Sequence, residues 1–144
     1  MHMLKIFKAV WFMSMLAMLS MLLYIYAALP EIVVIQDDGG DIVSISKEAF
    51  FYALLVLGGI VNVLVYIVAR LDPGAQAFRT WFYGQIITLN FFLIIALSFV
   101  HLFNSAEKFD YPRIGFIVYG SVGLVVLWAL SWPIIKIFSL SKAK

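Results

Sequence analysis

The chain has 144 residues, of which 65% are apolar and only 12% are charged. About a quarter of the residues in soluble domains are charged, so this composition indicates an integral membrane protein. There is no cysteine, which excludes disulfides and thiolate chemistry, and a net charge of +2 is too small to indicate nucleic-acid binding.

Four long apolar segments predict four membrane-spanning helices, because a spanning helix needs about 20 mainly apolar residues. Pro30 is expected to end the first helix, and Pro133 to kink the last. The first apolar run is longer than the core of a signal peptide, so we expect a retained helix. The predicted spans are residues 10–29, 49–69, 81–103 and 114–138, within a single membrane domain, 1–144.

The longest segment outside the spans, residues 30–48, predicts a small extracytoplasmic β-hairpin. Two β-branched stretches, 31–36 and 41–46, flank an Asp-Asp-Gly-Gly turn, and Ser46 is a plausible N-cap for the next helix. The turn lacks the ligand spacing of an EF-hand, so we interpret it as a solvated acidic turn. Its candidate sensing residues are Asp37, Asp38 and Asp41.

Polar and small residues inside the spans predict helix contacts. Asn62 lies ~12 Å along its helix from Arg70, and Asn90 lies ~15 Å from Thr80. Because the second and third spans are antiparallel neighbours, the two amides should face each other at similar depth. Glycines also allow helices to approach closely. The candidate packing residues are Gly58, Gly59, Asn62, Asn90, Gly120 and Gly123.

The distribution of charge predicts that both termini are cytoplasmic in a bacterial inner membrane. Seven of the ten Lys and Arg residues flank the spans on the side of the termini: Lys5, Lys8, Arg70, Arg79, Lys136, Lys142 and Lys144. The hairpin and the third loop carry only Lys47, Lys108 and Arg113, and cytoplasmic loops are richer in basic residues. The expected aromatic belt at the cytoplasmic boundary is Trp11, Trp81, Phe82, Trp128 and Trp132.

The sequence contains few residues that would support catalysis or ion-coupled transport. No Asp, Glu, Lys or Arg lies at the centre of a span, which argues against ion-coupled transport. We therefore expect no enzyme activity, no metal and no cofactor. His2 and His101 belong to opposite sides of the membrane and cannot share one haem iron. His101 is most simply an interfacial residue, and it stays a candidate for proton sensing or contact with a partner.

Several segments carry a family resemblance over the whole chain. Leu29-Pro30-Glu31, the acidic turn, residues 46–52 (SKEAFFY) and residues 109–116 (FDYPRIGF) resemble short four-pass membrane proteins of Bacteroidota, a group without an established activity. A first span, Leu-Pro, a glycine turn and Ser-Lys are also similar to the N-terminal module of bacterial toxin-immunity membrane proteins. Val33-Val34-Ile35-Gln36 replaces the Pro-x-His-Phe-Asn core of that module.

These observations lead to three functional hypotheses. The first is a non-catalytic accessory or assembly subunit of a larger membrane complex, because methionine-rich and glycine-rich helices suit contact with other subunits or with a second copy. The alternative is an extracytoplasmic sensor or a toxin-immunity-like protein that uses the acidic hairpin. The third, a small transporter or lipid-handling protein, lacks an ionisable site inside the membrane. In each case the lipid bilayer is the surrounding partner.

Overall fold

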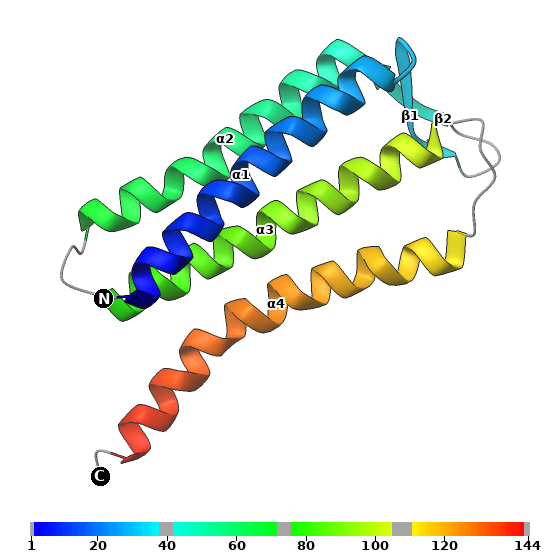
Figure 1. Ribbon diagram of the computed structural model, residues 1–144. Helices are drawn as coiled ribbons and strands as arrows, with labels where there is room; N and C mark the ends of the chain where they lie inside the picture. Colours follow the sequence, from blue (N-terminus) through cyan, green and yellow to red (C-terminus); the bar gives the residue numbers. More distant parts are fainter. Residues whose placement is uncertain (1, 38–41, 72–75, 105–110, 143–144) are drawn as a thin grey trace.

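The computed structural model describes residues 2–37, 42–71, 76–104 and 111–142. Its elements in chain order are α1 (His2–Ala28), β1 (Ile32–Asp37), β2 (Ile42–Ser46), α2 (Lys47–Leu71), α3 (Gln76–Phe103) and α4 (Tyr111–Lys142). The predicted fold class, four helices with a hairpin between the first two, is confirmed (Figure 1).

All four helices are long and apolar enough to cross a membrane: Met3–Ala28, Lys47–Leu71, Gln76–Leu102 and Gly115–Ser139. The helices extend beyond the predicted apolar runs, and α1 begins eight residues before the expected start at Val10. The reason is that a helix satisfies its own backbone hydrogen bonds and continues into polar flanks without needing apolar side chains.

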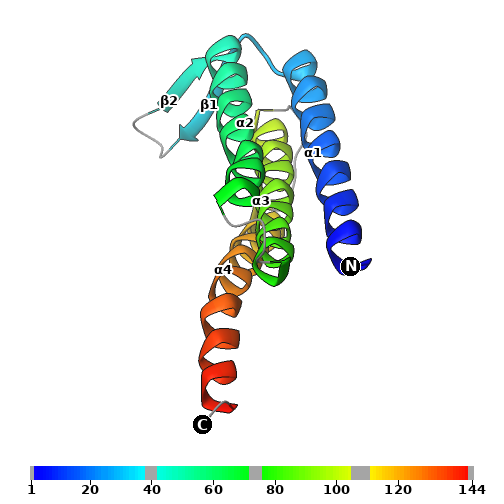
Figure 2. The ribbon, with the colours of Figure 1, turned by 90° about the vertical axis from the view of Figure 1, so that its left-hand side faces the viewer.

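α1, α2 and α3 form a three-helix bundle, and α4 packs against the outside of this bundle. α1, α2 and α3 run side by side with the hairpin at one end, and both termini lie at the other end (Figure 1). α4 packs mainly along α3, and it touches α1 through the Trp128 ring, whose centre lies 6.2 Å from that of Phe7. The last turns of α4 run away from the other helices in both views (Figures 1 and 2). Pro133 lies in this diverging half, where its missing N–H and its ring weaken the preceding turn.

Two apolar clusters form the core, and α3 contributes to both. The cluster next to the hairpin contains Leu22, Ile25, Leu29, Val33, Phe50 and Leu97. The cluster next to the termini contains Trp11, Val65, Tyr83, Ile86 and Ile87. α1 therefore packs on α3 along most of its length, and α2 completes the three-helix unit.

The hairpin is joined to the helices by packing and by backbone bonds. β1 and β2 are antiparallel, with an irregularity between Val34 and Gln36. The Val33 side chain is fully buried in the cluster beside the hairpin. The predicted N-cap is confirmed, since the Ala49 amide donates to Ser46 Oγ at 3.2 Å. β2 thus passes directly into α2 without a connecting loop.

Candidate functional site

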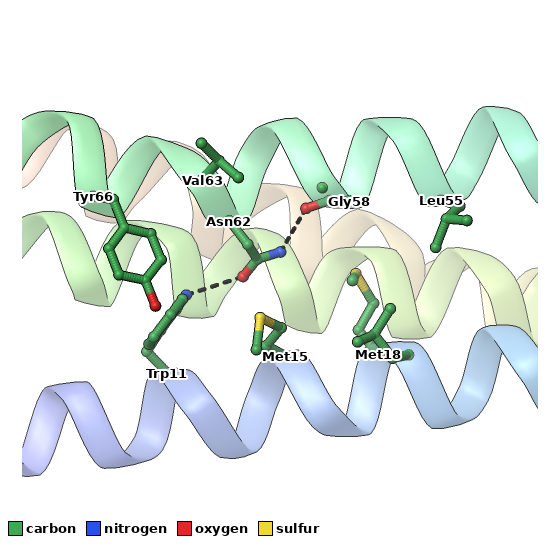
Figure 3. A pocket seen from close by; sticks show the side chains of 10 residues that line it. Trp11, Met15, Met18, Leu55, Gly58, Asn62, Val63 and Tyr66 are labelled. Atoms are coloured by element: carbon green, nitrogen blue, oxygen red, sulfur yellow. Dashed lines mark hydrogen bonds between the residues drawn. The ribbon is translucent and has the colours of Figure 1, made fainter.

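A buried pair of amides lies between the two apolar clusters. Asn62 Nδ2 donates to Asn90 Oδ1 at 3.0 Å, and Asn90 Nδ2 donates back to Asn62 Oδ1 at 2.9 Å. Asn62 is 5% exposed and Asn90 is fully buried. The predicted pairing of these two residues is confirmed. Asn62 Nδ2 also donates to the Gly58 carbonyl at 2.7 Å, so the amide is oriented by its own helix (Figure 3).

α1 joins this pair through two residues that the sequence interpretation missed. Trp11 Nε1 donates to Asn62 Oδ1 at 3.0 Å (Figure 3). Asn90 Nδ2 donates to Ser14 Oγ at 3.0 Å. Ser14 Oγ in turn donates to the Trp11 carbonyl at 2.7 Å. We call Trp11, Ser14, Asn62 and Asn90 the amide network. It links α1, α2 and α3 at the depth where water is absent and unpaired polar groups are costly.

The place of Trp11 in the aromatic belt stays a prediction, whereas its burial against α2 was not predicted. Its ring is 6% exposed and lies at the depth of Asn62, because a buried indole finds its acceptor there. A signal for this was present in the sequence. Residues of α1 with three- and four-residue spacing form one face, and this face is the buried one: Trp11, Ser14, Met18, Leu22 and Ile25.

The glycines show a mixed outcome. Gly58 is a close-packing position as predicted, since a Cβ there would lie 2.8 Å from Met18 Cε. A Cβ at Gly59, Gly120 or Gly123 would meet no described atom within 4 Å, so these glycines make no close helix contact among the described residues, and their role in helix packing stays a prediction. These three glycines lie on faces that α1 and α3 do not cover.

A second contact, between α3 and α4, depends on a glycine that was not predicted. A Cβ at Gly84 would overlap the indole ring of Trp128. Trp128 Nε1 donates to the Trp81 carbonyl at 2.9 Å, and Trp81 Nε1 donates to the Trp128 carbonyl at 2.9 Å. Trp81 Nε1 also reaches Ser131 Oγ at 3.0 Å. This reciprocal indole pair holds α4 against α3 and explains why both rings are partly buried.

Gln85 is the remaining polar side chain in the contact between α3 and α4. Its Nε2 lies 3.5 Å from the Val125 carbonyl, at the limit of a hydrogen bond. Its Oε1 is buried and has no hydrogen-bond partner among the described residues. The amide therefore contributes less to the α3–α4 contact than the indole pair.

Two apolar grooves open between the helices. The smaller, about 160 Å³, lies between α1 and α2 over the amide network and is lined by Met15, Met18, Gly58 and Tyr66 among others (Figure 3). The larger, about 330 Å³, lies between α1, α3 and α4. The buried polar groups beside them are already bonded, since the Asn62 amide bonds to Asn90 and the Thr88 hydroxyl donates to the Gln85 carbonyl at 2.6 Å.

The candidate sensing residues do not assemble into a site among the described residues. His101 is half-buried and packs edge-on against Tyr24, with ring centroids 5.9 Å apart. Asp38 and Asp41 lie outside the described residues, as does the side chain of Asp37. In the described part of the chain, no group of three or more His, Cys, Asp or Glu side chains is placed to hold a metal ion.

Comparison with known proteins adds no relative. No family model, no curated protein and no solved structure matches this chain. The fold itself decides the broad class, since four helices of spanning length require a lipid environment. The chain is an integral membrane protein. Any narrower function has to be argued from its surfaces and its buried contacts.

Proposed function

We propose that the protein is a non-catalytic accessory or assembly subunit of a larger complex in the bacterial inner membrane. The observation that carries this proposal is the uncovered face of α4. Phe116 is 82% exposed and Tyr119 79% exposed, and they share a helical face with Gly120 and Gly123. Large side chains beside glycines suit helix–helix packing, because a glycine lets the backbone of a second helix approach closely. Contact with lipid does not require a glycine.

The interior supports a structural role in place of a catalytic one. The polar groups of the amide network bond to each other, and the two indoles between α3 and α4 bond to backbone carbonyls. A general acid, base or nucleophile would need a side chain free to meet substrate. These buried groups are committed to holding helices together.

The test is extraction of the tagged protein from its native membrane in mild detergent, followed by identification of co-purifying chains by mass spectrometry. We expect a stoichiometric partner with the natural sequence and its loss with Gly123→Leu, which has open space and leaves the fold of this chain intact. Gly59→Leu is the control on α2, since a Cβ there likewise meets no described atom within 4 Å. A natural protein that purifies alone as a monomer contradicts the proposal.

The proposed orientation, with both termini in the cytoplasm, has a separate test. The chain contains no cysteine, so a single introduced cysteine reports its own side of the membrane. Cysteine at the exposed Ser139 should resist an impermeant thiol reagent applied to whole cells, whereas cysteine at the exposed Ser44 should react. The opposite pattern would reverse the orientation.

The hairpin supports a second candidate, an extracytoplasmic sensor or toxin-immunity-like protein. Because Val33 is anchored in the core and β2 continues into α2, a ligand on the hairpin would act directly on the helices. Replacing Asp37, Asp38 and Asp41 with Asn should then abolish a protective phenotype. Unchanged protection would remove this candidate.

A further inference from the structure

The larger groove has a floor on α3 and walls on α1 and α4. Gly84 and Phe91 mark the two ends of the floor, Val10 belongs to the α1 wall, and Leu124 and Trp128 belong to the α4 wall. The groove exists because the Trp128 ring is seated on Gly84 by its bond to the Trp81 carbonyl. α4 is therefore held to α3, and the Phe7 ring of α1 meets the Trp128 ring at one end of the groove, with centroids 6.2 Å apart.

Neither water nor a polar ligand suits this groove. Its one hydroxyl, on Thr88, already donates to the Gln85 carbonyl, and a buried water needs two to four polar partners. An empty space would cost the lining its dispersion contacts. The walls are open to the surroundings, since Val10 is 44% and Leu124 46% exposed. In a bilayer, what surrounds them is hydrocarbon.

The position of the groove along the membrane fits a single leaflet. From Gly84 to Phe91 the floor runs seven residues, or ~10 Å of helix. Phe91 adjoins Asn90 near the middle of the candidate span Gln76–Leu102, and Gly84 lies in its first half, eight residues from the start at Gln76. One leaflet contributes about half of the ~30 Å hydrocarbon thickness, so an acyl chain from that leaflet matches the length of the floor.

The charges at this end of the bundle indicate which headgroup belongs to the chain. Among the described side chains, every charged one at the end that holds the termini is basic: Lys5, Lys8, Arg70, Arg79 and Lys136. On α4, Trp132 and Lys136 follow the groove residue Trp128 in four-residue steps toward this end, and Lys136 Nζ lies 5.8 Å from the centre of the Trp132 ring. Basic side chains at a membrane surface attract anionic lipids.

We propose that the groove between α1, α3 and α4 is a lipid site that holds one acyl chain of an anionic phospholipid from the leaflet at the basic end. The hydrocarbon fills the space between Val10 and Leu124, and the phosphate lies near Lys136. This site is separate from the glycine face of α4 and does not depend on a partner subunit.

The experiment uses the purified full-length chain alone. It is reconstituted with equal amounts of phosphatidylglycerol and phosphatidylcholine, stripped with detergent and weighed by native mass spectrometry. We expect one phosphatidylglycerol to remain on each chain. The double variant Val10→Trp/Leu124→Trp fills the groove and should retain at least tenfold less phosphatidylglycerol per chain. The matched control, Met13→Trp/Val122→Trp, places two indoles on exposed residues that line neither groove and should retain the lipid.

A second variant tests the headgroup without touching the groove. Lys136 is exposed, and Lys136→Gln should keep a bound lipid while losing the preference for phosphatidylglycerol over phosphatidylcholine. Equal retention by the filled and the control double variants overturns the proposal. So does equal retention of the two lipids by the natural chain, or a lipid-free dimer in which a second copy covers the groove.

Discussion

Replacing Asn90 with Ala tests whether the amide network stabilises the three-helix unit. Asn90 is fully buried and makes three hydrogen bonds to other helices, two with Asn62 and one with Ser14. Hydrogen bonds between membrane helices contribute about 0.6 kcal/mol each on average. The substitution should therefore lower the free energy of unfolding by about 2 kcal/mol, with a further contribution from the space left by the side chain.

A double-mutant cycle isolates the energy of the hydrogen bonds between Asn62 and Asn90 from the other effects of each substitution. The free energy of unfolding is measured by SDS titration in mixed micelles with tryptophan fluorescence, for Asn62→Ala, Asn90→Ala and both together. The two shared hydrogen bonds predict a coupling energy of about 1 kcal/mol. Ser121→Ala is the control, since this buried hydroxyl bonds only within its own helix, to Val118, and should change stability by less than about 0.5 kcal/mol.

Two outcomes would refute the reasoning. If Asn90→Ala is no more destabilising than Ser121→Ala, the buried amides do not hold the helices together. If the effects of Asn62→Ala and Asn90→Ala simply add, the two amides act separately and their reciprocal bonds carry no measurable energy.

Two further predictions concern α4 and the hairpin. Gly84→Ala should destabilise the protein by about 1–3 kcal/mol because the new methyl group meets the Trp128 ring, while Gly123→Ala, with open space, should not; thermal unfolding compares the two. Val33→Ala removes two buried carbon atoms and should cost about 1.6 kcal/mol, with faster proteolysis of the hairpin, whereas Ile32→Ala, 64% exposed, should match the natural protein.

Much of the fold could be predicted from the sequence because membrane helices obey simple rules of length and polarity. Counting residues inward from Arg70 and Thr80 placed Asn62 and Asn90 at one depth, and a short connection made their helices neighbours. The same reasoning identified Ser46 as a cap, since a hydroxyl before a helix has a local partner.

The packing of α4 could not be predicted in this way. Lipid tails are as apolar as leucine, so no hydrophobic pattern says which face of a spanning helix meets protein. Gly84 stands alone in its span, and Trp128 has the position of an interfacial residue. Only the three-dimensional arrangement brings them together, whereas Gly120 and Gly123, which have the more obvious spacing, meet no described atom of this chain.

The two proposals meet on α4. The hydrogen bonds of the amide network join α1, α2 and α3, whereas the hydrogen bonds of the indole pair, Trp81 and Trp128, join α4 to α3. The angle of α4 to the bundle therefore depends on what fills the groove beside Leu124. Because Gly120 lies one turn from Leu124, a lipid in that groove would also set the position of the glycine face. Binding of a partner subunit should then be stronger in membranes that supply the anionic lipid.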